Sequence, residues 1–175
     1  MIERGLRDPW ASIDFGGLPN IPAEELFGAA VLQLYKSIHS PYNSVLKLLL
    51  MEAYAVDFPS TTLISTHFKR NIEDGKVDLD AVDPYILMYN KVSAYLEGIN
   101  DVVRLEVLRR SFYLKANVAI SNRRAITSDW RASIVKRMVA DWNWTSTQVE
   151  RLDRRDDWGL AIALEERRDL TKTFK

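Results

Sequence analysis

The chain has 175 residues, of which 47% are hydrophobic and 27% charged, and these values are ordinary for one soluble globular domain. Its 24 basic and 24 acidic side chains give zero net charge, which argues against a general nucleic-acid-binding protein. Cysteine is absent, which excludes disulfides, thiolate metal sites and cysteine nucleophiles. No apolar run approaches the ~20 residues that span a bilayer, so we expect a cytoplasmic protein without a membrane span.

Residues 1–20 predict an irregular connector, because glycine and proline interrupt them too often for a regular element. Residues 21–175 predict one helical domain, since helical periodicity recurs along them and no alternating strand pattern is found. We therefore expect an all-α fold, a multi-helix bundle of about seven or eight helices joined by short loops.

The first predicted helix begins near Pro22, and Phe27, Val31, Leu34 and Ile38 form an amphipathic stripe along it. The dipeptide Ser40-Pro41 ends this helix and opens a second. Apolar side chains cover most of the circumference of the second helix, which runs to about residue 55. We expect the second helix to be central to the core.

Later helices are marked by capping residues. Asp83 and Asp101 each precede a predicted helix, and Thr145 with Gln148 forms a capping box. The predicted helices run over about residues 61–73, 84–97, 101–117 and 128–142, with a short one after Thr145 and a last one from about Trp158.

The residues that begin the second helix could bind an anion. Ser40, Ser44 and Lys47 are spaced to share one face, and a helix start offers unpaired N–H groups. Lys36 lies about one turn earlier and could add charge. The alternative is structural: Ser40 caps the helix, and Lys47 extends to water or pairs with an acid.

Two other charged stretches have structural interpretations. Asp78, Asp80 and Asp83 could suggest a metal site, but Asp83 is better explained as a helix cap before proline. The helix after Asp101 is basic, and we interpret its arginines as a solvated face in which Glu106 can pair with Arg110. A phosphate-facing or partner-facing patch is the alternative for that helix.

Residues Glu25–Lys36 read ELFGAAVLQLYK and resemble a segment of the class I adenylate cyclases of enteric bacteria, Glu-Tyr-Phe-Gly-Ala-Ser/Ala-Leu-Trp-x-Leu-Tyr-Lys. This chain departs from it at Leu26, Val31 and Leu32. Further similar segments follow in the family's order, so the resemblance covers roughly residues 10–158. They are SIHSPYNSVLKLLLMEAY, Asp83–Tyr85, Arg109–Lys115 and Trp142–Trp144.

The resemblance implies a lyase of cyclic AMP biosynthesis that converts ATP to cyclic AMP and pyrophosphate with Mg²⁺. In that family a nucleotidyltransferase domain, with a Gly-Ser turn and paired metal-binding aspartates, precedes the helices. This chain contains neither motif, and a family segment expected beyond Lys175 is also missing. We therefore expect a helical fragment, incomplete at both ends relative to the family. It should hold no catalytic residue and no metal ligand, and should be inactive alone.

The resemblance also implies nucleotide contacts in the segment that begins the second helix. Lys36 and Lys47 would supply charge to the phosphates, Ser40 and Ser44 would contact phosphate oxygens, and Tyr42 would contact the nucleoside. Mg²⁺ would be bound elsewhere in the complete enzyme.

The expected partners are ATP and the upstream nucleotidyltransferase domain of the same enzyme, with no nucleic acid. The alternative function is a non-enzymatic helical protein-interaction module. An enzyme segment should place the Ser40–Lys47 stripe in a concave, positive pocket, whereas an interaction module should show a wide exposed apolar patch. Helices that lack their neighbouring domain would expose apolar surface, so we also expect self-association.

Overall fold

The computed structural model describes residues 21–37, 41–75, 78, 82–121, 130–158, 165–166 and 168–170. Over these residues the chain is helical and contains no strand, which confirms the predicted all-α class. The helices are α1 (Ala23–Lys36), α2 (Pro41–Val56), α3 (Ile64–Glu73), α5 (Pro84–Gly98), α6 (Val102–Ala116), α7 (Trp130–Asp141), α8 (Ser146–Asp153) and a 3₁₀ turn (Arg155–Asp157).

The predicted capping residues begin their helices as expected. The Asp83 carboxylate accepts hydrogen bonds from the backbone N–H groups of Tyr85 and Ile86, at 2.8 and 3.1 Å. Asp101 accepts one from the N–H of Arg104 at 2.9 Å. Thr145 and Gln148 form the reciprocal capping box. These bonds satisfy N–H groups that a helix start leaves without partners.

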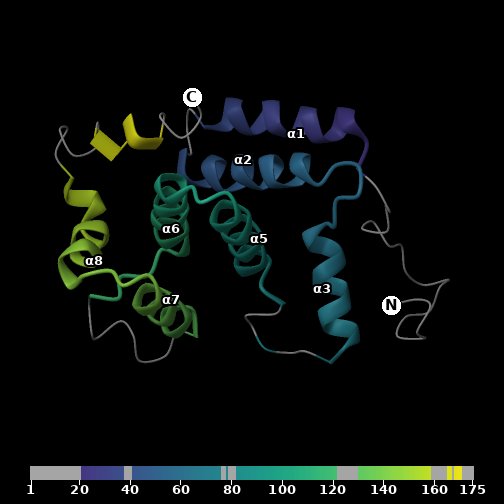
Figure 1. Ribbon diagram of the computed structural model, residues 1–175. Coiled ribbons are helices and arrows are strands. Elements are labelled where there is room, and N and C mark those ends of the chain that lie inside the picture. Colours follow the sequence, from purple (N-terminus) through teal and green to yellow (C-terminus); the bar gives the residue numbers. More distant parts are fainter. Residues whose placement is uncertain are drawn as a thin grey trace.

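Helix α2 occupies the centre of the bundle, as its apolar circumference predicts. Figure 1 shows α1 lying along one side of α2 in the opposite direction, while α5 and α6 approach α2 from the other side. Helix α3 packs against α5, and α7 packs against α6. Within α2, the side chains of Val45, Leu46 and Leu49 are almost completely buried.

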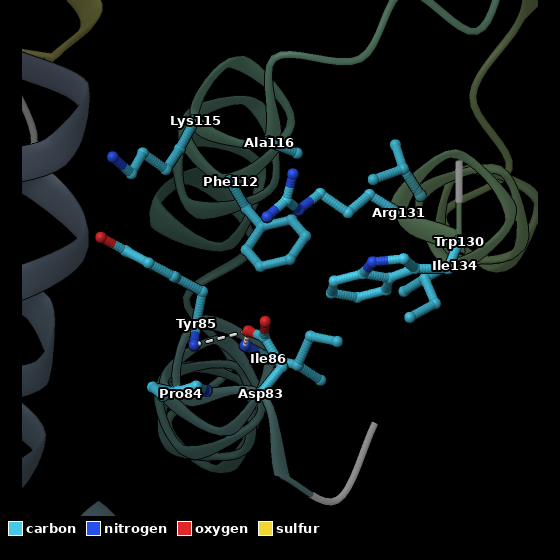
Figure 2. Close-up of a pocket in the computed structure, with 11 residues that line it drawn as sticks. Asp83, Pro84, Tyr85, Ile86, Phe112, Lys115, Ala116, Trp130, Arg131 and Ile134 are labelled. Atoms are coloured by element: carbon cyan, nitrogen blue, oxygen red, sulfur yellow. Dashed lines mark hydrogen bonds between the residues drawn. The ribbon is translucent and has the colours of Figure 1, made fainter. Parts of the chain in front are cut away.

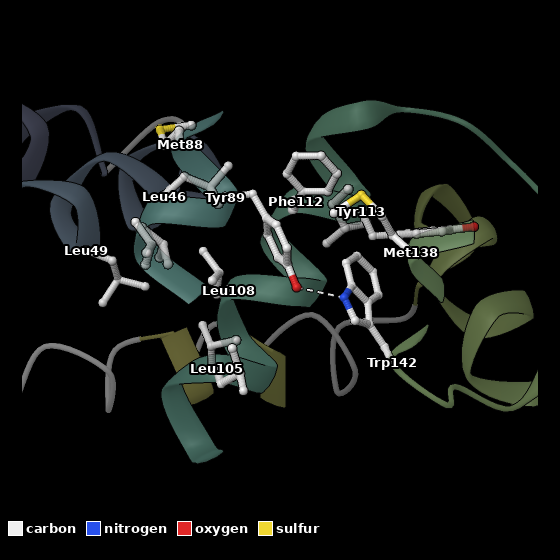
Figure 3. Close-up of a cluster of buried hydrophobic side chains, with 14 of the residues drawn as sticks. Leu46, Leu49, Met88, Tyr89, Leu105, Leu108, Phe112, Tyr113, Met138 and Trp142 are labelled. Atoms are coloured by element: carbon white, nitrogen blue, oxygen red, sulfur yellow. Dashed lines mark hydrogen bonds between the residues drawn. The ribbon is translucent and has the colours of Figure 1, made fainter. Parts of the chain in front are cut away.

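The core extends from α2 through α5 and α6 to α7. Figure 3 shows Leu46 and Leu49 at one end of this core, and Tyr89, Phe112 and Trp142 in its middle. The ring of Tyr89 lies 5.0 Å from that of Phe112 and 5.6 Å from that of Trp142. The Trp142 indole N–H donates to the Tyr89 hydroxyl at 2.7 Å, so the buried indole is satisfied.

Helix α1 differs from α2, α5 and α6 because its apolar stripe does not face the core. Phe27 is 73% exposed and Tyr35 68%, and Val31 and Leu34 are exposed as well. No residue of α1 is buried. Leu26 of α1 packs against the core, as does Ile21, which precedes the helix. Periodicity identifies an apolar face correctly, but it does not say which surface covers that face.

One predicted helix start is wrong. Helix α3 begins at Ile64 and not near residue 61, because the hydroxyl of Thr61 donates to the Tyr54 carbonyl at 2.9 Å and holds that residue before the helix. Trp158 is extended after the 3₁₀ turn, and residues 165–166 and 168–170 are the helical ones among the described residues that follow, so the start of the last predicted helix lies outside the described residues. The first residues of the helix predicted over about 128–142 lie outside the described residues, as do residues 1–20 of the predicted connector.

Candidate functional site

The predicted anion-binding residues lie where α1 ends and α2 begins. Lys36 is the last residue of α1 and is exposed, and Figure 1 shows this end of α1 beside the start of α2. Tyr42 lies in the first turn of α2 and is half-buried, as is Lys47 one turn beyond. Ser44 is buried, and Ser40 lies outside the described residues. The antiparallel pairing of α1 and α2 thus brings Lys36 and Tyr42 to the same end of the bundle.

The two predicted phosphate-binding lysines have no acidic partner within the part of the chain that the structure describes. Among the residues that the structure describes, neither Lys36 nor Lys47 forms an ion pair. The structural alternative, in which Lys47 pairs with an acid, therefore finds no support in this part of the chain. The half-buried Lys47 keeps a positive charge that a bound anion could compensate.

The Ser44 side chain is enclosed. Its exposed fraction is 1%, and its hydroxyl has no hydrogen-bond partner among the described residues. Ser111, on the facing helix α6, is buried in the same way and likewise has no partner among them. A buried hydroxyl without a partner costs about 1–3 kcal/mol. Contact between Ser44 and a phosphate would require α2 to open toward solvent at this point.

Tyr42 lies in a strongly charged environment. Burial raises the pKa of its hydroxyl to about 12, and the nearby Glu166 carboxylate also raises it. Arg110 and Arg155 act in the opposite direction. The Tyr42 hydroxyl is therefore neutral at physiological pH and can donate a hydrogen bond.

The charges around Tyr42 belong to an ion-pair network that sequence analysis did not predict. Arg110 Nη1 lies 2.8 Å from Glu166 Oε2, and Arg110 Nη2 lies 3.7 Å from Asp169 Oδ2. Arg151 Nη2 lies 3.2 Å from Glu166 Oε1 and 3.3 Å from Glu165 Oε2. The buried Glu166 is thus held between an arginine of α6 and an arginine of α8. This network fastens the C-terminal helical residues to the bundle beside the start of α2.

Arg155 makes a second connection to α6. Its guanidinium donates to the Leu114 carbonyl at 3.0 Å and to the Asn117 side-chain oxygen at 2.5 Å. Nearby, the Tyr113 hydroxyl donates to Asp153 at 2.5 Å. Burial, together with the Asp153 carboxylate, raises the pKa of Tyr113 above its ordinary value. These bonds fix the end of α6 against the segment that follows α8.

The interpretation of α6 as a solvated basic face is wrong. Arg104 donates to both carboxylate oxygens of Glu52 at 2.7 Å and to Asp101 at 2.5 Å. Burial alone would lower the pKa of Arg104, but these hydrogen bonds outweigh it and raise that pKa. Glu106 lies 3.9 Å from Arg109 and does not take Arg110, which Glu166 binds. Arg104 and Arg110 therefore join α6 to other helical segments, whereas Arg109 pairs within α6.

Cavities of small-molecule size are present in the described part of the bundle. One of about 450 Å³ lies between α1 and α2, one of about 390 Å³ lies where α5, α6 and α7 meet, and one of about 350 Å³ lies farther along the same three helices. Tyr42, Ser44 and Lys47 line none of these three. The concave pocket expected around them is therefore not among these cavities, whereas the exposed apolar face expected of an interaction surface is present on α1.

The described residues contain no group of three histidine, cysteine, aspartate or glutamate side chains placed to hold a metal ion. Asp78 is exposed, and Asp80 lies outside the described residues. No helix within the described ranges combines the length and apolar character needed to cross a membrane.

Comparison with known proteins gives one consistent result. A family model described as "Adenylate cyclase, class-I, second domain" matches residues 21–174. An adenylate cyclase of Escherichia coli strain K12 is 39% identical over 160 residues, which are 91% of this chain and 19% of that protein. Adenylate cyclases of Proteus mirabilis and Yersinia intermedia are each 38% identical, and the matches cover 91% and 97% of this chain.

The chain spans about a fifth of the length of these relatives. No solved structure matches it significantly.

Proposed function

Because the chain belongs to the class-I adenylate cyclase family, we propose that it acts as the helical part of an enzyme that converts ATP to cyclic AMP and pyrophosphate. The observation that carries this proposal is the family match, which runs through nearly all of the helical region. A non-enzymatic interaction module is not favoured, since the relatives that match share the name adenylate cyclase.

Within that enzyme, the start of α2 and the end of α1 contact the nucleotide. Lys36 and Lys47 supply positive charge to the phosphates, Ser40 and Ser44 contact phosphate oxygens, and Tyr42 contacts the nucleoside. Support comes from the two lysines, which form no ion pair within the described residues. Tyr42 lies near Arg110 and Arg155 and also near Glu166, which pairs with Arg110, so charges of both signs surround the helix start.

The chemistry at the α-phosphate depends on groups outside the described residues. In this proposal Mg²⁺ is held by another part of the enzyme, where it would activate the ribose oxygen. The role of this chain is then to fix cations beside the leaving pyrophosphate, where negative charge develops. We expect the isolated chain to be inactive, because positioned charge alone does not activate the ribose oxygen.

The exposed face of α1 is where the rest of the enzyme docks. Phe27, Val31, Leu34 and Tyr35 are all exposed and lie at spacings of four, three and one residues, so they share one side of the helix. The relatives are about five times longer than the match, so most of their chain lies outside this region. A nucleotidyltransferase domain of the same enzyme that covered this face would bury its apolar surface. It would also stand next to Lys36.

The test is the Lys47→Ala variant of the full-length enzyme that contains this segment. Loss of one charge-assisted phosphate contact costs about 1.5–3 kcal/mol, so kcat/KM for ATP should fall about 10- to 150-fold. Lys136→Ala is the matched control, because Lys136 is an exposed lysine of α7 and should leave the kinetics unchanged. Unchanged kinetics in Lys47→Ala would refute the phosphate assignment.

A further inference from the structure

A buried carboxylate joins two arginines beside the start of α2. Glu166 is 5% exposed, and its two oxygens accept from different helices. Oε2 accepts from Arg110 Nη1 of α6 at 2.8 Å, and Oε1 accepts from Arg151 Nη2 of α8 at 3.2 Å. Figure 1 shows the C-terminal helical residues, in yellow, between α8 and the start of α2. Two guanidinium groups that converge on one carboxylate form the kind of site with which proteins bind anions.

The charges at this place divide between two segments of the chain. The helical bundle contributes cations, because Arg155 lies near Tyr42 as Arg110 does. The described acids that pair with Arg110 and Arg151 all belong to one C-terminal stretch, and they are Glu165, Glu166 and Asp169. If this stretch moved away, the two arginines would lose their described acidic partners and the surface beside Tyr42 would be cationic.

Glu166 does not use the full donor capacity of its two arginines. Each guanidinium donates to it through one nitrogen. The Nε of Arg110 is buried and has no hydrogen-bond partner among the described residues. A guanidinium can donate through two nitrogens at once to a phosphate, which carries more acceptor oxygens and more negative charge than a carboxylate. A phosphate would therefore match the two arginines better than Glu166 does.

The cations of the cavity between α5, α6 and α7 are arranged differently. Figure 2 shows Arg131 on one side of Phe112, with Lys115 extending on the other side. These two cations do not meet on one group, whereas the two arginines beside α2 bind the same carboxylate. Convergence therefore makes the arginine pair the better anion site of the two.

We propose that Arg110 and Arg151 bind the phosphate chain of a nucleotide, and that Glu166 occupies their site when no nucleotide is bound. This inference rests on the proposed function, which places the nucleotide at the adjacent start of α2, and it adds two phosphate ligands and a competing acid. Because Glu166 is almost fully buried, the phosphate enters only when residues 165–166 and 168–170 move off the bundle. The C-terminal residues thus lower the apparent affinity, since only the open fraction of molecules binds.

The first experiment measures the binding of inorganic tripolyphosphate and of ATP to the 175-residue chain by calorimetry, without Mg²⁺. Glu166→Gln keeps the volume of the side chain but removes its charge, so both ligands should bind about tenfold more tightly. Glu150→Gln is the matched control, because Glu150 is exposed on α8 and its substitution changes the net charge equally. This control should leave both affinities unchanged.

A purely structural ion pair predicts a different result for Glu166→Gln, namely lower stability with unchanged affinity. That result, or the absence of binding at millimolar concentration, overturns the proposal. Tighter binding of tripolyphosphate alone would overturn the assignment of the site to a nucleotide.

The second experiment tests the arginines. Arg151→Met should weaken tripolyphosphate binding by about tenfold, and it should leave the chain folded because the Arg151 side chain is 46% exposed. Arg154→Met, at the exposed arginine that follows α8, is the matched control and should leave the affinity unchanged. Wild-type affinity in Arg151→Met would overturn the proposal.

Lys47→Ala separates this inference from the proposed function. Affinity that falls in Lys47→Ala but not in Arg151→Met would support the Lys47 contact and overturn the arginine site. The reverse result would support the arginine site and refute the Lys47 contact.

Hydrogen exchange tests the movement of the C-terminal residues. Tripolyphosphate should speed exchange of the backbone N–H groups of residues 165–166 and 168–170, and Glu166→Gln should do so without ligand. Exchange within α5 should stay unchanged. Exchange at the C-terminal residues that slows or does not change on binding would overturn the displacement.

Discussion

The Ser44 hydroxyl should lower the stability of the fold but support phosphate binding in the complete enzyme. Substitution of Ser44 by alanine tests both effects. This hydroxyl is buried without a described partner, so it lowers stability in the structure described. We expect Ser44→Ala to raise the free energy of unfolding by about 1 kcal/mol, measured by urea denaturation. If the hydroxyl contacts phosphate in the complete enzyme, the same variant should also lose activity there.

Ser111→Ala is the matched control for this prediction, since Ser111 is equally buried and unpartnered but lies on α6. It should give a similar gain in stability and leave activity unchanged. A loss of stability in both variants would show that the hydroxyls have partners that the described residues do not reveal.

Asp101 makes the start of α6 sensitive to acid. The backbone N–H of Arg104 donates to its carboxylate, as does the Arg104 guanidinium, and these bonds lower the pKa of Asp101 below its ordinary value. A carboxyl whose pKa is lower in the folded state stabilises the protein above the unfolded pKa of about 3.9, and this stability is lost as the pH falls through the folded pKa.

We therefore expect part of the acid destabilisation of the chain below about pH 4 to come from this residue. Asp101→Asn keeps a capping side chain but removes the charge. At pH 7 the variant should be less stable than wild type, and the difference should shrink toward pH 2, as followed by thermal unfolding. A difference that stays constant between pH 7 and pH 2 would contradict this account.

At the scale of helices, local sequence signals predicted what depends on local bonds. Asp83, Asp101 and the Thr145–Gln148 pair cap helices where the sequence placed them, because each cap joins residues two or three positions apart. The central position of α2 was also predictable from its nearly continuous apolar surface. No comparable local signal predicted that the apolar stripe of α1 would face solvent and not the core.

The candidate site was less predictable because its charges come from distant positions. The ion pair of Arg110 and Glu166 joins residues 56 positions apart, and no spacing rule connects them. The chain places a compatible acid, Glu106, one turn before Arg110, and that local pair was the wrong choice. Tyr42 was predicted to contact the nucleoside, but the sequence did not show that Arg110 and Arg155 would lie near it.

The ion pair of Arg110 with Glu166 should contribute more to stability than that of Arg151 with the same carboxylate. Glu166 is 5% exposed, and the Arg110 side chain is 21% exposed against 46% for Arg151. We expect Arg110→Met to lower the free energy of unfolding by about 1–3 kcal/mol, because it leaves a buried carboxylate with a weaker partner. Arg151→Met, the control, should cost about 1 kcal/mol or less. Equal losses in urea denaturation would show that burial does not distinguish the two arginines.

At the scale of the whole molecule, the main feature without a structural explanation is the exposed apolar stripe of α1. Its apolar stripe is open although α1 lies along the helix that forms the centre of the bundle (Figure 1). Contiguous apolar surface of this kind is uncommon on proteins that remain monomeric. In the complete enzyme we assign it to the neighbouring domain, so in the isolated chain the same face should drive self-association.

This assignment predicts a concentration-dependent oligomer for the isolated chain, measured by sedimentation velocity. Phe27→Ser combined with Tyr35→Ser should shift the chain to monomer, because it removes the two most exposed rings of α1. The free energy of unfolding of this double variant should change little, since exposed side chains contribute little to the fold.

The matched control is the double variant Val102→Ser with Val103→Ser. These residues are 71% and 76% exposed on α6, and their loss should leave the oligomer unchanged. In the full-length enzyme the Phe27/Tyr35 variant should lose activity, whereas the Val102/Val103 variant should keep it. A wild-type chain that is monomeric at all concentrations and binds no dye for apolar surface would contradict the role assigned to α1.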